Sequence, residues 1–235
     1  MIGTIYRVTL KMQATRPRLI ALGLLGVVGV LIGLAIGVGD VRDPLNAGTN
    51  MINAFGLSLY APVVTLVFAS ASLGDPTEDG TLVYFWLRPV PRSQIVAATY
   101  LATLTVALPL VLVTLGLAAV LTGAGGGLVW GTLASATLAV IAYGGIFTWL
   151  GLRVRRALVW GLAYILLWEG FVASAGRSAA RLAVRAYTRS VLHDATGVDL
   201  KLATVSSAYA VIVPVVIAAV ATAATVRRLR RTEVA

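Results

Sequence analysis

Long apolar segments separated by short polar stretches dominate the pattern of this chain. An α-helix rises about 1.5 Å per residue, so roughly 20 apolar residues cross the hydrocarbon layer of a membrane. Segments of this length predict an all-α integral membrane protein in which residues 1–235 form a single transmembrane domain. The six predicted spans are residues 19–38, 52–73, 94–121, 128–151, 157–175 and 207–226.

The distribution of cationic side chains indicates how these spans are oriented. Six spans place both termini on one side, and cytoplasmic segments of membrane proteins carry an excess of Lys and Arg. With the termini inside, the inner segments carry Arg7, Lys11, Arg16, Arg18, Arg88, Arg92, Arg153, Arg155, Arg156, Arg227, Arg228, Arg230 and Arg231. The outer segments carry the smaller group Arg42, Arg177, Arg181, Arg185, Arg189 and Lys201. Both termini are therefore predicted to be cytoplasmic.

Residues 1–18, which precede the first span, have two chemically different faces. At about 100° per residue, apolar side chains fall on one arc and cations on the other. The two sets are Ile2, Ile5, Val8 and Met12, and Arg7, Lys11 and Arg18. This segregation predicts a helix in the inner membrane interface, with its cations directed toward lipid headgroups. The alternative is a basic flank that forms no helix.

The first span carries glycines at intervals of four residues, Gly29, Gly33 and Gly37. Small residues at this spacing allow helix backbones to approach closely in lipid. We expect this face to pack on another helix, either within the chain or across a dimer.

The outer segment, residues 176–206, contains arginines at every fourth position. Apolar side chains, including Tyr187, fall on the opposite arc, which predicts a basic amphipathic or re-entrant outer helix between spans five and six. Its arginines would meet lipid phosphate or an anionic substrate, or would simply be solvated. They are Arg177, Arg181, Arg185 and Arg189, opposite Ala180, Ala183, Tyr187 and Val191.

The composition agrees with a membrane protein and argues against an enzyme. Only 12% of residues are charged and the mean hydropathy is +0.91, whereas soluble domains average about 25% charged residues. The net charge of +10 is assigned to cytoplasmic segments and not to nucleic-acid binding. No cysteine and a single histidine, His193, disfavour a metal site or a His-based triad. The chain also lacks a phosphate-binding G-x-x-x-x-G-K-[ST] loop, so we expect no catalytic residues and no bound ATP.

The fifth span contains the candidate substrate pathway. Glu169 is the one ionisable residue deep in a predicted span, and a charge at such a depth favours a functional role. The alternative is a structural role, such as an ion pair with nearby arginines. Trp160, Tyr164, Trp168 and Phe171 recur on one helical face, which suits either a ligand cavity or interfacial anchoring.

The polar segment 75–93 interrupts the apolar pattern and faces the cytoplasm in the predicted topology. Asp75 and Glu78 suit the N-cap and the capping box of a helix. Leu82–Leu87 is an apolar and aromatic stretch that is too short to span, and the rigid turn 88–92 ends it. An exposed patch of this kind favours a docking site for a cytoplasmic protein. The alternative is a loop packed on its own bundle.

Two motifs in this segment resemble the first cytoplasmic loop of type-2 ATP-binding-cassette (ABC) permeases. They are Glu78-Asp-Gly-Thr-Leu82 and Arg88-Pro-Val-Pro-Arg92-Ser93, and the layout of the whole chain is also similar to that family. In those permeases the loop is a coupling helix that inserts into a groove of a separate ATPase subunit. The resemblance implies docking roles for Glu78, Asp79, Gly80, Thr81, Leu82, Tyr84, Phe85, Trp86, Arg88 and Arg92.

The same resemblance implies the remaining parts of a transporter. Two ATPase subunits would carry ATP and Mg²⁺, a second permease subunit, identical or homologous, would complete the pathway, and this chain would hold no cofactor. The expected location is the bacterial cytoplasmic (inner) membrane, and the expected activity is export of a lipophilic or amphipathic substrate. The alternatives are an ion-coupled secondary transporter, which usually contains several buried ionisable residues, and a non-transporting membrane anchor for a cytoplasmic partner.

Overall fold

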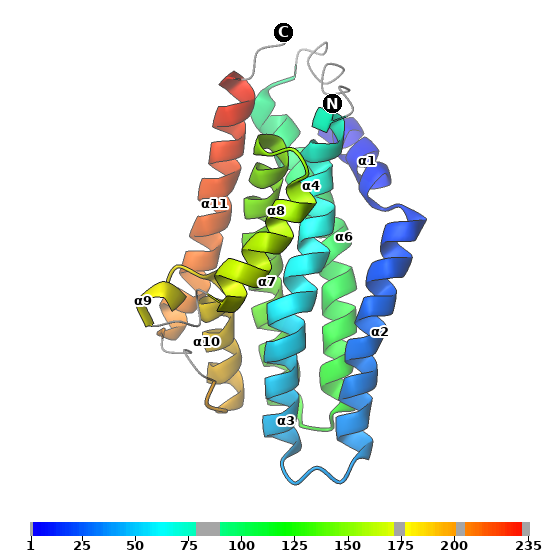
Figure 1. Cartoon of the computed structure of the whole chain (residues 1–235), viewed down its shortest axis with the longest axis vertical. Helices are drawn as coiled ribbons and strands as arrows, with labels where there is room; N and C mark the ends of the chain where they lie inside the picture. Colours follow the sequence, from blue (N-terminus) through cyan, green and yellow to red (C-terminus); the bar gives the residue numbers. More distant parts are fainter. Residues whose placement is uncertain (1, 79–89, 172–176, 201–204, 232–235) are drawn as a thin grey trace.

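A computed structural model describes residues 2–78, 90–171, 177–200 and 205–231, which form helices joined by short turns, with no strand among them (Figure 1). The expected all-α class is therefore confirmed for these residues. The segments labelled η are π-helical. The helices are α1 (Ile2–Gln13), α2 (Arg16–Val38), α3 (Pro44–Met51), η1 (Ile52–Tyr60), α4 (Ala61–Glu78), α6 (Arg92–Leu121), α7 (Gly126–Arg153), α8 (Ala157–Ala163), η2 (Tyr164–Phe171), α9 (Arg177–Ala180), α10 (Val184–Thr196) and α11 (Ser207–Arg231).

Five helical stretches of the described chain are long and apolar enough to cross a membrane: α2, Pro44–Asp75, α6, α7 and α11. The protein is thus a multi-pass membrane protein. The fifth predicted span, residues 157–175, corresponds to the shorter apolar helix Ala157–Phe171, and its last residues lie outside the described ranges. A sixth full span stays a prediction.

The second span is longer than its apolar residues predict. The side chain of Asp43 accepts a hydrogen bond from the backbone N–H of Asn46, so α3 begins with Pro44 in its first turn. α3 then continues through η1 into α4. Within η1, the Ser58 hydroxyl donates to the carbonyl of Asn53 at 2.6 Å. The sequence does not predict helix in α3, because polar residues interrupt the apolar pattern there.

The centre of the bundle is α7, which packs against α4, α6, α10 and α11. Its buried Tyr143 and Phe147 stack with ring centroids 5.6 Å apart. Small residues of α7 also allow close approach to neighbouring helices. Gly145 lies against Ala218 of α11, and Gly151 lies against Ser70 of α4. Close packing of this kind is the usual cohesion between helices in lipid.

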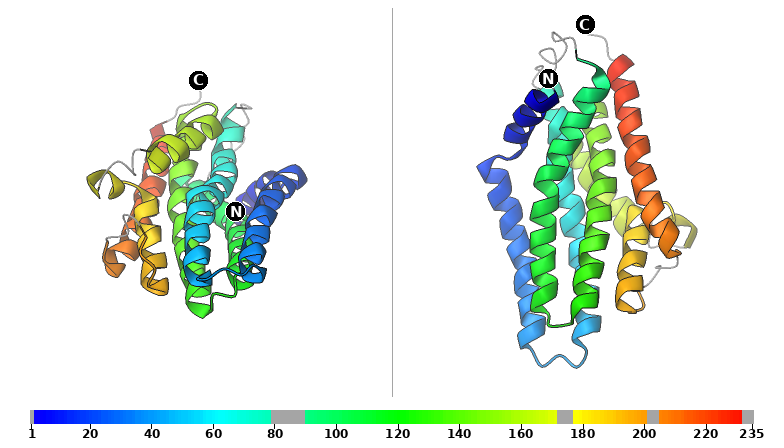
Figure 2. Two further views of the ribbon diagram at one scale, coloured as in Figure 1. Left: turned by 60° about the horizontal axis from the view of Figure 1, so that its bottom comes forward. Right: turned by 180° about the vertical axis from the view of Figure 1, so that it is seen from behind.

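The glycine face of α2 packs within the chain. A Cβ at Gly33 would meet the backbone carbonyl of Ala118 in α6, and one at Gly37 would meet the carbonyl of Leu121. Figure 2 shows α2 at the edge of the bundle beside α6. This resolves the expected alternatives for these two glycines in favour of an intramolecular contact.

The predicted N-terminal helix exists as α1, which lies across the end of the bundle at an angle to α2 (Figure 1). Gln13 donates to the Thr103 hydroxyl, and Tyr6 donates to the Thr105 hydroxyl, each at 3.0 Å, so α1 is attached to α6. The face packed on the bundle differs from the predicted apolar arc. Its buried residues are Ile5, Thr9 and Gln13, whereas Ile2, Val8 and Met12 are exposed.

The outer segment departs from the predicted single helix. α9 ends at Ala180, and a turn separates it from α10, so the fourfold arginine spacing does not run along one helix. α10 packs against α7 and α11. Arg185 and Arg189 are half-buried, so the alternative of a fully solvated arginine face does not hold for these two residues. The reason is that α10 has neighbours on both of its faces.

The beginning of α1 and the end of α11 lie at the same end of the bundle (Figure 1). This arrangement agrees with termini on one side of the membrane. The assignment of that side to the cytoplasm stays a prediction, which rests on the distribution of cations.

Candidate functional site

The first candidate region is the end of the bundle where α4 stops and α6 starts. Asp75 lies within α4, close to its C-terminal end, and its Oδ2 pairs with Nη2 of Arg18 at 2.8 Å. The predicted N-cap at Asp75 is therefore wrong. α4 simply continues through Pro76, and the carboxylate is used for a partly exposed ion pair with the start of α2.

Arg92 fixes the other side of this region. It is the first residue of α6, directly after the N-cap residue Pro91. Its Nη1 donates to the carbonyl oxygen of Leu229 in α11 at 2.8 Å. A guanidinium at the last turn of a helix satisfies a carbonyl that has no intrahelical partner and interacts favourably with the helix dipole. Arg92 thus joins the beginning of α6 to the end of α11.

A small hydrophobic core includes Leu229 and also Leu73, two residues before Asp75, and we call it the basal cluster. It joins α1, α4, α6, α7 and α11 at the end of the bundle that carries the termini. Burying these side chains fixes the end of α4 relative to the beginning of α6. The buried members are Ile5, Leu73, Ile95, Val96, Ala98, Leu152 and Leu229.

Most of the predicted docking residues lie outside the described ranges. Within those ranges, the backbone of Glu78 ends α4 and Arg92 makes the contact with Leu229. The docking role of the whole set stays a prediction. The residues outside are Asp79, Gly80, Thr81, Leu82, Tyr84, Phe85, Trp86 and Arg88.

The second candidate region surrounds Glu169 at the end of η2. This side chain is only 2% exposed. Its Oε1 accepts hydrogen bonds from the Tyr164 hydroxyl and from the backbone N–H of Val184, each at 3.0 Å, and its Oε2 accepts one from the N–H of Arg185 at 3.2 Å. Val184 and Arg185 are the first two residues of α10. Glu169 therefore caps a helix that follows it in the chain.

This arrangement favours the structural alternative for Glu169. The groups of α10 that bind its carboxylate are backbone N–H donors, and not arginine side chains in an ion pair. The first N–H groups of a helix have no intrahelical acceptors and carry partial positive charge, so a buried carboxylate is well placed there. The Arg185 side chain instead donates from Nη1 to the backbone oxygen of Glu169 at 3.4 Å.

Arg189 connects α10 to η1. Its Nε donates to Oδ1 of Asn53 at 2.7 Å. Burial lowers the pKa of Arg185, and burial with the neighbouring Arg185 charge lowers that of Arg189 to about 10. With a pKa of about 10, Arg189 stays protonated at neutral pH. Both π-helical segments border this region, and π-helical turns often occur at functional sites.

The aromatic residues of the candidate pathway separate in the structure. Tyr164 turns toward the bundle, where its ring meets Phe147 edge-on with centroids 6.1 Å apart. Trp160 is 60% exposed on the surface of the described chain, and Trp168 is half-buried. From Tyr164 onward the segment is π-helical, which changes the spacing on which the predicted common face depended.

Sequence reasoning missed Asn53 and Tyr143 as members of this region. Asn53 lies within an apolar span, and a polar side chain in that position was a usable signal. Tyr143 lies fully buried in α7, where its ring stacks on Phe147, and Phe147 in turn meets Tyr164 edge-on. Nothing in its local sequence distinguishes it from an ordinary core aromatic residue.

The helical architecture and the membrane-length helices define a multi-pass membrane protein with no soluble catalytic domain among the described residues. The family model for ABC-2 family transporter proteins matches residues 9–177, which include the predicted docking segment, residues 75–92, and the helices around it. The chain belongs to this family and is a permease, the non-enzymatic membrane component of a transporter. A comparison with curated proteins found no match.

Proposed function

We propose that this chain is the permease subunit of an ATP-driven exporter, coupled to a separate ATPase through residues 75–92. Family membership supports the transport function. The observation that carries the coupling proposal is the basal cluster, which holds together both ends of the docking segment. A partner bound to that segment would act on α4 and α6 together.

The mechanism follows from these attachments. ATP binding draws two ATPase subunits together, and each moves the docking segment of one permease. α4 and α6 both pack on α7, so their displacement reaches the centre of the bundle. Coupling requires that ATP favour one state of the permease over the other, because a ligand with no differential affinity shifts nothing.

Aspartate substitution in the apolar patch tests this proposal. We expect Phe85→Asp and Trp86→Asp to abolish co-purification of the ATPase in mild detergent, because a charge in an apolar interface stays unpaired and desolvated. The measurement is the amount of ATPase retained per permease, together with substrate-stimulated ATP hydrolysis. Normal retention and normal stimulation in both variants would contradict the proposed docking site.

Trp130→Asp is the matched control. Trp130 is 73% exposed and lies in the first turns of α7, away from the basal cluster. The same chemical change at this position should leave ATPase retention intact. Loss of retention in the control as well would indicate general damage and would remove support for docking through residues 82–87.

Export of a lipophilic or amphipathic substrate is proposed from the family resemblance and the apolar bundle. The test is ATP-dependent movement of a fluorescent lipid or dye across vesicles that contain permease and ATPase. The ion-coupled alternative finds less support, since the Glu169 carboxylate is engaged by protein donors and is not directed to solvent. Transport driven by an ion gradient without ATP would favour that alternative.

A further inference from the structure

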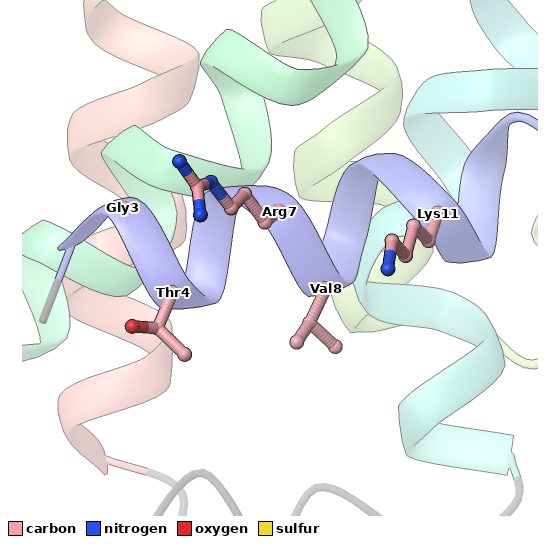
Figure 3. A pocket seen from close by; sticks show the side chains of 5 residues that line it. All are labelled: Gly3, Thr4, Arg7, Val8 and Lys11. Atoms are coloured by element: carbon pink, nitrogen blue, oxygen red, sulfur yellow. The ribbon is translucent and has the colours of Figure 1, made fainter.

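A shallow hollow follows the outward side of α1, and its described lining comes entirely from this helix. Figure 3 shows the side chains along the helix, with Arg7 and Lys11 on neighbouring turns. The lining residues are Gly3, Thr4, Arg7, Val8 and Lys11. Gly3 has no side chain, and a Cβ there would meet nothing within 4 Å, so the helix backbone is open at this position.

The two cations in this hollow lack an acidic partner within the described part of the chain, where the ion pair found is Arg18 with Asp75. Arg7 and Lys11 are both exposed and lie four residues apart. Side chains at this spacing are neighbours on a helix, and like charges there repel one another. An anion between them removes the repulsion and accepts hydrogen bonds from both groups. Thr4 adds a hydroxyl on the same side.

The opposite face of α1 holds the cations in place. Ile5, Thr9 and Gln13 are buried, and the Gln13 amide is bonded to Thr103 of α6. The helix therefore cannot turn its cations inward without losing these contacts. A binding face that is already oriented loses less entropy when its ligand arrives.

Apolar side chains beside the cations indicate which kind of anionic ligand the hollow binds. Val8 and Met12 are 46% and 40% exposed on α1, and Leu24 on the adjoining α2 is 64% exposed. α2 is a membrane-length helix of high hydropathy, so its exposed side chains meet acyl chains. An acidic protein would match the cations alone, whereas a phospholipid matches both the cations and their apolar neighbours.

We propose that Thr4, Arg7 and Lys11 bind the phosphate of an anionic lipid headgroup, while Val8 and Met12 contact its acyl chains. The site uses none of the residues predicted for docking, and it does not use Glu169. It depends neither on the direction of transport nor on the identity of the cargo. Anionic lipid bound at this site holds α1 in place. Because Ile5 of α1 is part of the basal cluster, the bound lipid also stabilises that cluster.

The test is lipid retention by the purified full-length chain in detergent, measured by native mass spectrometry with phosphatidylglycerol and phosphatidylcholine as probes. The unaltered chain should retain phosphatidylglycerol preferentially. A cation near an anionic surface contributes about fivefold in affinity, so the double variant Arg7→Gln/Lys11→Gln should bind on the order of 20-fold more weakly. Arg7→Lys/Lys11→Arg, which keeps both charges, should restore binding.

Arg227→Gln/Arg230→Gln is the matched control, because it removes two exposed cations of α11 at the same end of the bundle. It should bind lipid normally. Equal binding by the two double Gln variants would overturn the proposal. Equal retention of phosphatidylcholine would do the same, and so would displacement of the lipid by millimolar inorganic phosphate, since a free anion would then suffice. Preservation of the monodisperse chromatographic profile in each variant separates loss of the site from misfolding.

Discussion

At the scale of single residues, Glu169 supplies a cap that α10 lacks in its own sequence. The N-cap residue of α10 is Ala183, which has no side-chain acceptor. Glu169 instead brings a carboxylate from η2 to the first two backbone N–H groups of α10. One side chain therefore determines how η2 meets the next helix, and the two segments are coupled in stability.

Glu169→Gln is expected to weaken this junction. The amide replaces one acceptor oxygen by an N–H₂ group that faces a backbone donor, so at least one buried N–H loses its partner. Such a loss costs about 1–3 kcal/mol. The measurement is the SDS mole fraction at half-unfolding in mixed micelles, followed by circular dichroism, which should fall relative to the unaltered chain.

Tyr164→Phe is the graded control, because it removes one donor and leaves both backbone donors bonded to Glu169. Its effect should be smaller than that of Glu169→Gln. Measuring transport by the same variants separates the structural role of Glu169 from a role in substrate binding. A variant of unchanged stability that has lost transport would show that the carboxylate serves the substrate and would contradict the capping role.

Local sequence identified Glu169 as exceptional but could not predict its partners. Its backbone donors lie fifteen and sixteen residues later in the chain, at the start of α10. Asp75 shows the opposite error. Its capping pattern was local and plausible, but packing against Arg18 at the start of α2 decides its environment.

At the scale of helices, close approach determines where α2 can lie. Gly33 leaves room for the carbonyl of Ala118, and any side chain there would push α2 away from α6. Gly23, on the same helix, has nothing within 4 Å of a Cβ added to it. The two glycines therefore provide a matched pair for testing the contact.

Gly33→Val is expected to destabilise the bundle by about 1–3 kcal/mol, the usual cost of overpacking. Gly23→Val should change stability little, because its side chain enters open space. Both variants are compared by SDS titration and by yield in the membrane fraction. Equal destabilisation of the two would indicate a general intolerance of valine in α2 and would contradict the α2–α6 contact.

The apolar pattern predicts α6 and α7 to within about two residues at each end, because span length is set by membrane thickness. It does not predict the π-helical segments. Within those segments, the Ser58 and Tyr164 hydroxyls donate to groups five residues away, a spacing that apolar periodicity does not show. The sequence pattern also fails to predict the break between α9 and α10, because the regular arginine spacing favours one continuous helix.

At the scale of the whole molecule, the lack of cysteine makes the topology directly testable. Single cysteines can be placed at the exposed Val41, beyond α2, and at the exposed Arg230, near the end of α11. A membrane-impermeant maleimide should label Val41→Cys in intact cells and should label Arg230→Cys only after permeabilisation. The reverse pattern would invert the predicted orientation, and labelling of both in intact cells would place the two positions on the same outer side.

The class of the molecule follows from the sequence, whereas its internal contacts do not. Apolar length and the motifs of residues 78–93 predict a multi-pass ABC permease, and the family match over residues 9–177 confirms it. The contact of Arg189 with Asn53 and that of Arg92 with Leu229 join residues more than a hundred positions apart. Single-sequence periodicity carries no information about such distant pairs.

The contact between α2 and α6 also has a consequence for biosynthesis. α2 is made early, yet its glycine face fits a helix that emerges only after residues 92–121 have been translated. Among the five described spans, the most apolar 18-residue stretch of α2 has the highest mean hydropathy, 2.8, whereas that of α7 has 1.6 and is far more buried. α2 can therefore remain alone in lipid while the ribosome continues, and α7 needs its neighbours. We infer that the bundle assembles around α7, with α2 joining from the bilayer once α6 has been inserted.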